Sequence, residues 1–227
     1  MKKKIKDIIK QSTSLRDPHD FIVADLERRR VEDATIPKVD LKKEHIENTR
    51  FLLNRHDLLL ELPKNAVVAE IGVNRGDFST KIFELTQPKK LHLVDAWGDA
   101  SRYHDGLKLE VEEKFSTQIS EGRVEINLGF SQDVLATFPD NYFDWVYLDT
   151  DHRYKQTAIE LDILKRKVKP SGIIAGHDYI QGNWVGNVRY GVIEAVHELC
   201  LTDFWRLKFI TVNYKESPSF AIERIRG

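Results

Sequence analysis

Acidic residues close several short apolar runs of this sequence, and their repeated position indicates a binding site. Each run is typical of a buried β-strand, and the acids that end them are Glu70, Asp95, Asp149 and Asp178. Helical patterns separate the runs, so the strands should form a parallel sheet whose carboxyl ends share one edge, where ligands of such sheets bind. One strand-end acid is ordinary, but a group of them on one edge favours a cationic ligand or a metal ion over solubility alone.

A glycine turn follows the first of these strands. Gly72 and Gly76 flank Asn74, and an amphipathic helical pattern begins at Phe78. Glycines permit a tight turn and let a ligand lie against bare backbone, although such a turn can also need them for structural reasons alone. The G-x-x-x-G pattern departs from the G-x-G-x-x-G fingerprint of dinucleotide sites, and Glu70 is a poor neighbour for a pyrophosphate. S-adenosylmethionine, which has an ammonium and a sulfonium but no phosphate, suits this turn better.

Asp95 ends the second strand, about 20 residues after the glycine turn, near the interval at which an acid accepts hydrogen bonds from ribose hydroxyls. A turn or helix-capping aspartate is the alternative. Because the glycine turn precedes it, we expect Asp95 to bind the ribose of the cofactor.

Asp149 and Asp178 end the fourth and fifth strands, so their carboxylates can converge on one divalent ion. Without a cation the two would repel each other, and one would have to take up a proton. Oxygen ligands favour Mg²⁺, whereas an imidazole from His177 would shift the preference toward Mn²⁺, Fe²⁺ or Zn²⁺. We expect Asp149, His177 and Asp178 to hold the metal; the alternative for His177 is a hydrogen bond within the sheet edge.

The periodicity of the chain predicts its secondary structure. Strands are expected at residues 66–71, 90–95, 124–128, 143–149, 173–178, 207–212 and 219–225, with helices that include 103–121, 154–168 and 188–199. The last two strands follow each other without a helix, so they should pair antiparallel. The expected fold class is α/β: a seven-stranded, mostly parallel sheet with an antiparallel last strand, helices on both faces and extra N-terminal helices.

Residues 1–60 are charged and helix-prone, and we expect them to form an N-terminal helical extension to a domain at 61–227. A longer helix is expected over residues 41–60. Ile5, Ile8 and Ile9 form a short apolar stripe that could lie on a membrane surface. Because the stripe is too short for an anchor, we expect it to pack on the domain or on a second copy of the chain, as in a homo-oligomer.

Composition excludes several classes of protein. The 227 residues are 41% hydrophobic, enough for one α/β domain with a real core. The formal net charge of −1 leaves no basic excess to neutralise the phosphates of a nucleic acid. The single cysteine, Cys200, excludes an intramolecular disulfide, and no zinc-type spacing occurs. The sequence shows no signal core and no transmembrane run, so a cytoplasmic protein is expected.

With these residues placed, the span 60–226 resembles a class I S-adenosylmethionine-dependent methyltransferase, a family with a Rossmann-like fold. The stretch 70–76 resembles the first motif of that superfamily. Residues 129–133 resemble the segment whose serine and glutamine border the adenine in catechol O-methyltransferases. The resemblance implies that S-adenosylmethionine is bound by Glu70, Gly72, Asn74, Gly76, Asp95, Ser131, Gln132 and Asp149.

Residues 148–154 and 176–179 resemble two motifs of the metal-dependent O-methyltransferases, which include the catechol enzymes and bacterial enzymes that methylate sugar hydroxyls of antibiotics. In that group the metal is held by an aspartate, here Asp149, and by an acidic pair. The corresponding pair in this sequence is His177 and Asp178, which departs from the pattern.

The resemblance implies methyl transfer to a hydroxyl of a small molecule or sugar, assisted by Mg²⁺ or Mn²⁺ and by a base. Asp151 and His152 are the candidates for the base. Similar sugar-modifying enzymes use the aspartate two residues after the metal ligand, which favours Asp151. The alternative for His152 is a capping role or support of the metal ligands.

Two other functions agree less well with the sequence than methyl transfer does. A nicotinamide-dependent oxidoreductase is disfavoured by the missing first glycine of the fingerprint and by Glu70. A catalytically silent cofactor-binding module of a biosynthetic complex is disfavoured by the retention of Asp149, Asp151, His152 and Asp178.

Overall fold

The structure is a computed structural model that describes residues 18–98, 106–183 and 188–225. The chain divides into two compact units, Met1–Pro37 and Lys38–Gly227. Within the first unit the structure describes helix α2 (Pro18–Thr35), in which Arg28 and Arg29 form ion pairs with Asp25. The apolar stripe expected near the N-terminus lies outside the described residues.

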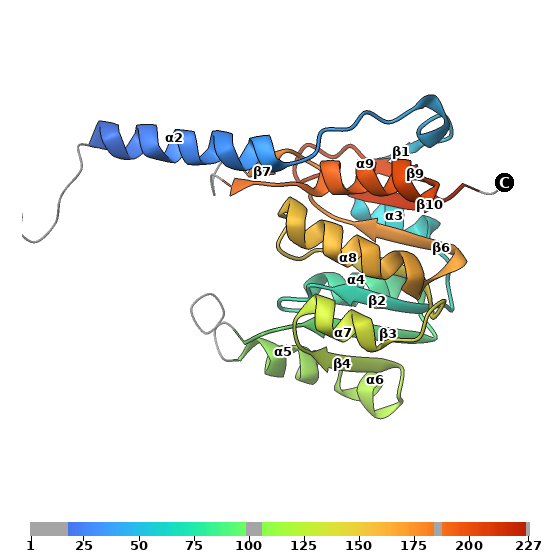
Figure 1. The fold of residues 1–227 in the computed structure, drawn as a ribbon. Helices are drawn as coiled ribbons and strands as arrows, with labels where there is room; N and C mark the ends of the chain where they lie inside the picture. The colour runs from blue at the N-terminus through green and yellow to red at the C-terminus, as the bar shows by residue number, and fades with distance from the viewer. Residues whose placement is uncertain (1–17, 99–105, 184–187, 226–227) are drawn as a thin grey trace, which may run out of the picture. The chain divides into compact units, whose positions relative to one another are not determined.

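A mixed sheet forms the centre of the second unit (Figure 1). In the described residues it has eight strands in the order β1-β9-β10-β6-β5-β2-β3-β4. The strands are β1 (Arg50–Leu52), β2 (Val67–Ile71), β3 (Lys90–Asp95), β4 (Val124–Leu128), β5 (Phe143–Leu148), β6 (Val168–Gly176), β9 (Trp205–Thr211) and β10 (Phe220–Arg224). Only β10 runs against its neighbours, β6 and β9. The predicted fold class, with its antiparallel last strand, is confirmed.

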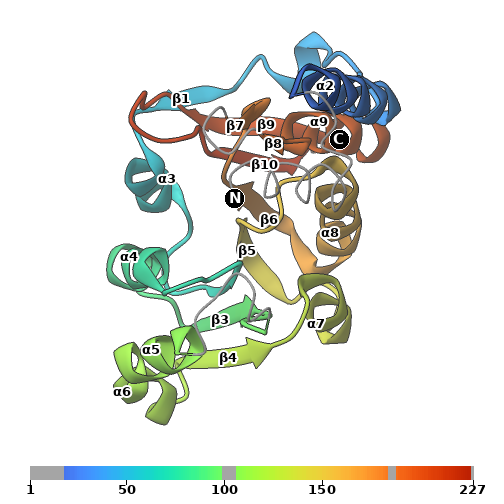
Figure 2. The same cartoon turned by 90° about the vertical axis from the view of Figure 1, so that its left-hand side faces the viewer.

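Helices cover both faces of this sheet (Figure 2). One face is covered by α3 (Arg55–Glu61), α4 (Asp77–Thr86), α5 (Leu107–Lys114) and α6 (Ser116–Ser120), the other by α7 (Ser131–Thr137), α8 (Tyr154–Lys167) and α9 (Val192–Asp203). Each face has its own apolar core, because the residues of a buried strand alternate between the two sides. Leu58, Phe78 and Val111 belong to the first core, and Leu135, Leu161 and Val196 to the second.

The continuous helix expected over residues 41–60 is wrong, and so is the count of seven strands. This stretch contains a short 3₁₀ helix (Lys43–His45), the edge strand β1 and then α3. The side chain of Asn54 ends the extended segment, because it accepts hydrogen bonds from the backbone of His56 and Asp57 and so caps α3. β1 pairs in parallel with β9, a partner more than 150 residues later, so local periodicity did not reveal this strand.

Other element boundaries also differ from expectation. Residues 107–120 form two short helices, α5 and α6, where a single helix was expected. β6 begins at Val168, five residues before the strand that was expected at 173–178. A small second sheet pairs β7 (Gly182–Asn183) with β8 (Val188–Arg189), so helix α9 begins four residues later than predicted.

Candidate active site

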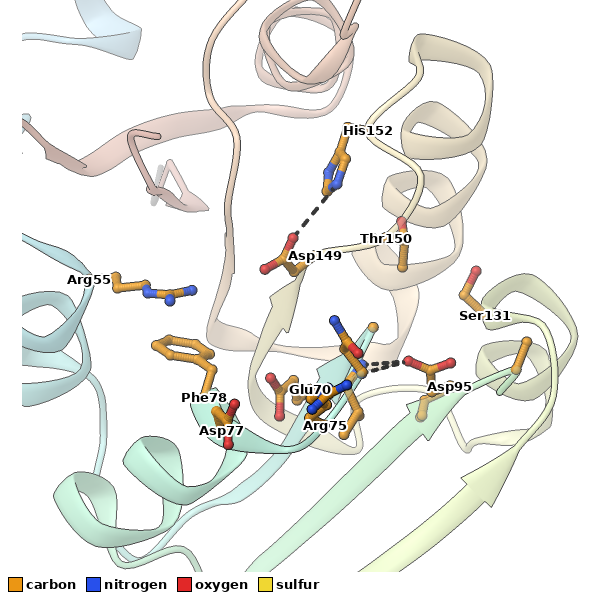
Figure 3. Close-up of a pocket in the computed structure, with 15 residues that line it drawn as sticks. Arg55, Glu70, Arg75, Asp77, Phe78, Asp95, Ser131, Asp149, Thr150 and His152 are labelled. Carbon is orange, nitrogen blue, oxygen red and sulfur yellow. Dashed lines mark hydrogen bonds and ion pairs between the residues drawn. The ribbon is translucent and has the colours of Figure 1, made fainter. Parts of the chain in front are cut away.

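A cavity of about 390 Å³ opens at the carboxyl ends of β2, β3 and β5 (Figure 3). This is the edge of the sheet at which the sequence placed its acids, and the volume lies within the usual range for small-molecule sites. Of the predicted site residues, the cavity lining includes Glu70, Gly72, Asn74, Asp95, Ser131, Asp149 and His152.

Gly72 has a structural role that is independent of any ligand. Its φ of +91° lies in the left-handed region, and a Cβ there would be 1.9 Å from the backbone oxygen of Asp149. The close approach joins the ends of β2 and β5. Gly76, with φ +73°, caps α4, and an added Cβ would meet Val111 and Phe115. Gly72 lines the cavity and Gly76 begins the helix beside it, so both glycines have a structural reason of the kind considered from the sequence.

Asp95 links the loops that follow β2 and β3. One carboxylate oxygen accepts hydrogen bonds from the backbone nitrogens of Val73 at 2.8 Å and Asn74 at 2.9 Å, and the other accepts one from Trp97 at 2.9 Å. The indole nitrogen of Trp97 in turn donates to the backbone oxygen of Asn74 at 2.8 Å. A carboxylate has about four acceptor positions, so Asp95 keeps capacity for a ligand hydroxyl.

Glu70 lies under the cavity and is only 2% exposed. Burial raises the pKa of its carboxyl to about 8; the hydrogen bond from the Ser79 hydroxyl acts in the opposite direction, and the charge of Asp149 adds to the increase. At neutral pH the carboxyl of Glu70 is therefore mostly protonated, and a cation bound beside it would favour the charged carboxylate.

A cluster of two carboxylates and two imidazoles lies above Glu70. His152 Nδ1 is 3.3 Å from Asp178 Oδ2, and His177 Nδ1 is 3.4 Å from the same oxygen. Asp149 lies 3.9 Å from each ring, through different oxygens. Burial raises the pKa of Asp149. Burial would also raise that of Asp178, but hydrogen bonds from His177 and Ser217 lower it below its usual value. The cluster therefore holds Asp178 charged.

In the part of the chain that the structure describes, one group of side chains could hold a metal ion, and it shares two members with the predicted set. One ligand atom from each of Asp149, His152 and Asp178 lies within 4.8 Å of the others, whereas the prediction combined His177 with the two aspartates. The Nε2 atom of His177 is buried and has no hydrogen-bond partner among the described residues. Burial would lower the pKa of His177, but its contact with Asp178 raises it overall.

Five predicted site residues are not part of this cavity lining: Gly76, Gln132, Asp151, His177 and Asp178. Asp151 is exposed and pairs with Arg153 at 3.5 Å. Gln132 is half-buried on α7, next to Ser131, which does line the cavity. Their roles stay predictions.

The structure also brings in residues that the sequence reasoning missed. Arg55 of α3, Phe78 and Thr150 line the cavity, and the fully buried Glu160 of α8 supports it from behind. Glu160 accepts hydrogen bonds from the hydroxyls of Ser131 and Thr150, the latter at 2.8 Å. Arg55 lies in a stretch without a motif, so no local signal could have identified it.

Comparisons with known proteins agree with this geometry. Residues 69–179 match a family model described as "Methyltransferase domain". No curated protein sequence matches the chain. Similar solved structures include a SAM-dependent methyltransferase from Aquifex aeolicus, with 15% identity, a TM-score of 0.54 and coverage of 75% of this chain and 89% of that one.

Two further structures show the same fold. A putative methyltransferase from Streptococcus mutans in complex with SAH has 15% identity and a TM-score of 0.53, over 75% of this chain and 96% of that one. A putative rRNA-methylase from Clostridium thermocellum has 14% identity and a TM-score of 0.57, over 83% and 99%. The family match indicates a methyltransferase domain over residues 69–179, and these neighbours share its fold. None of the described helices is both long and apolar enough to span a membrane.

Proposed function

We propose that this methyltransferase transfers the methyl group of S-adenosylmethionine to a hydroxyl oxygen of a small molecule or sugar, with assistance from a divalent metal. The observation that carries the proposal is the cluster of Asp149, His152 and Asp178, two of whose members, Asp149 and His152, line the same cavity as Glu70 and Asp95. A methyl donor in that cavity would have its reactive carbon close to the cluster.

The candidate metal ligands fit a divalent cation. Two carboxylates and an imidazole suit Mn²⁺, Fe²⁺ or Zn²⁺, and Mg²⁺ is compatible with the carboxylates. The Nε2 atom of His177, which has no hydrogen-bond partner among the described residues, is a further candidate ligand atom. When bound, such an ion would lower the pKa of the acceptor hydroxyl.

The residues of the chain have three tasks in this proposal. Glu70 and Asp95 bind the ammonium and the ribose of the donor, and so align its methyl group; alignment of this kind can supply about 7–11 kcal/mol of the barrier. Asp149 and Asp178 would hold the ion, which would supply a binding point for the acceptor oxygen. His152, which lies in the cavity, takes the hydroxyl proton if the imidazole that coordinates the ion is that of His177, because a coordinated His152 would have no free basic nitrogen. Asp151 is the alternative base, although its exposure and its pair with Arg153 favour it less.

The acceptor is expected to be small. The net charge of −1 provides no basic surface excess for a nucleic acid. Likeness to a putative rRNA-methylase at 14% identity is a likeness of fold.

Calorimetry tests the donor first. We expect S-adenosylmethionine and S-adenosylhomocysteine to bind and NAD not to bind. Tight binding of NAD without a response to either adenosyl ligand would exclude the proposal and favour an oxidoreductase.

Methyl transfer is then tested with radiolabelled donor and a panel of phenols and sugars. EDTA should stop turnover without preventing donor binding, and Mg²⁺ or Mn²⁺ should restore it. The Asp178→Asn variant should keep donor affinity and lose most of its activity. Full turnover in EDTA would refute the role of the metal, and donor binding without transfer to any acceptor would favour the silent module.

A further inference from the structure

Arg55 differs from its neighbours because its guanidinium is held in place without being fully paired. The group lies over the ring of Phe78, 4.5 Å from its centroid, and its Nε is 3.4 Å from Glu216 Oε2. None of its side-chain nitrogens forms a hydrogen bond within the described residues. Figure 3 shows the group pointing from α3 into the cavity, over Phe78 and toward Asp149.

A nearby arginine shows that this arrangement is not the default. The guanidinium of Arg50, on β1, also lies over an aromatic ring, that of Phe209 at 5.4 Å. Both of its terminal nitrogens donate to Glu61, at 2.8 and 2.9 Å. The two terminal N–H groups of Arg50 are therefore used in hydrogen bonds to a protein carboxylate. The terminal N–H groups of Arg55 remain available to a ligand in the cavity.

The surroundings of Arg55 define the ligand group that fits. The guanidinium of Arg55 and the buried carboxyl of Glu70 line the same cavity, so a cation and an acid are both within reach of one ligand. An α-amino acid carries an ammonium and a carboxylate on the same carbon, so it complements such a pair. Asp95 and Ser131 lie at the other end of the cavity, where the nucleoside would be (Figure 3).

We propose that Arg55 is a carboxylate-binding subsite and that its occupant is the carboxylate of the aminoacyl end of the methyl donor. The inference rests on the proposed donor, S-adenosylmethionine. A planar guanidinium can bind a carboxylate through two parallel hydrogen bonds. The ring of Phe78 and the carboxylate of Glu216, which also accepts a hydrogen bond from the backbone nitrogen of Arg55 at 3.3 Å, hold the group in place before the donor arrives. The subsite lies outside residues 69–179, the span that matches the family model.

The test compares S-adenosylmethionine with its decarboxylated form, which keeps the ammonium, sulfonium and nucleoside. Wild-type protein should bind the complete donor more tightly, by roughly 10-fold to 100-fold, the range of hydrogen bonds between charged groups. In Arg55→Met this ratio should fall to about 1, since affinity is lost only for the ligand with the carboxylate. Arg55→Lys should give an intermediate ratio, and Arg50→Met should keep the wild-type ratio.

The outcomes separate the two proposals. If wild-type protein binds neither ligand, the proposed donor is wrong. If both ligands bind and the ratio survives in Arg55→Met and Arg55→Lys, the subsite is refuted. A loss of the same size for both ligands would also refute it, because the arginine would then only shape the cavity. A KM effect restricted to carboxylate-bearing acceptors, with an unchanged ratio, would assign Arg55 to the acceptor instead.

Discussion

Glu70 shows how one buried side chain can connect the fold to ligand chemistry. It belongs to a strand whose neighbours are apolar, so water is excluded and the neutral acid is favoured. Its folded pKa of about 8 is above the ordinary value of 4.5. Between these two pH values the folded protein keeps a proton that the unfolded chain releases, and stability should fall as pH rises through this window.

We predict that binding of the methyl donor releases the proton of Glu70. A donor ammonium beside Glu70 favours the charged carboxylate, so donor binding at pH 7 should release up to one proton. Calorimetry in two buffers with different ionisation enthalpies measures this number. In Glu70→Gln the release should vanish, and the decrease in stability between about pH 5 and pH 8 should flatten. Equal binding heats in both buffers for wild-type protein would contradict the prediction.

Asp95 tests the difference between positioning a loop and binding a ligand. Asp95→Ala removes the acceptor of three backbone hydrogen bonds and the proposed acceptor for the ribose hydroxyls, so we expect the affinity for the methyl donor to fall by about 1.5–3 kcal/mol together with a loss of stability. Asp144 is a matched control, because it accepts a hydrogen bond from the backbone of Val67 at 2.8 Å and does not line the cavity.

Both variants are measured by denaturant unfolding and by titration with S-adenosylhomocysteine. Asp144→Ala should lose stability but keep its affinity. If Asp95→Ala unfolds more easily while binding as tightly as wild type, Asp95 is a structural residue.

At the scale of elements, helix α8 supports the cavity wall formed by the loop after β5 and the start of α7. Glu160 on α8 receives hydrogen bonds from Ser131, Thr150 and Gln156 and is fully buried. The hydroxyl hydrogens of Ser131 and Thr150 are thereby used inside the protein. Their oxygens keep only acceptor positions for the cavity, which suits the amino group of an adenine.

Removal of this acceptor should be costly. Glu160→Ala removes the acceptor shared by three half-buried donors, and we expect a loss of about 1–3 kcal/mol in the free energy of unfolding, together with weaker binding of the methyl donor. Asp162→Ala, on the exposed side of the same helix, should change stability by at most about 0.5 kcal/mol. Urea denaturation measures both, and similar losses in the two variants would show that the network contributes nothing specific.

At the scale of the whole molecule, the compact unit Lys38–Gly227 begins upstream of the domain start expected at residue 61. β1 extends the sheet beyond β9, and α3 buries Leu58 and Leu59 completely in one of the two cores. The residues that line the cavity all belong to this unit.

Truncation tests this boundary. A chain that begins at residue 38 should fold and bind S-adenosylhomocysteine like the full chain. A chain that begins at residue 61 should lose binding and much of its stability, because it lacks Leu58, Leu59 and Arg55; loss of one buried leucine side chain alone costs about 2–5 kcal/mol. Circular dichroism melts and calorimetry compare the two. Wild-type behaviour of the shorter chain would restore the boundary at residue 61.

Local sequence was sufficient for the fold class, the glycine turn and the edge of the sheet that carries the acids. Periodicity and turn residues act over a few positions, and the carboxyl ends of parallel strands must share an edge. Glu70, Asp95 and Asp149 could therefore be placed together in advance. Only tertiary structure decided that β1 is a strand, that His152 joins Asp149 and Asp178, and that Arg55 lines the same cavity as Glu70. These contacts depend on side chains that meet across long stretches of chain or on a turn geometry such as the positive φ of His152, and neither leaves a periodic signal in the sequence.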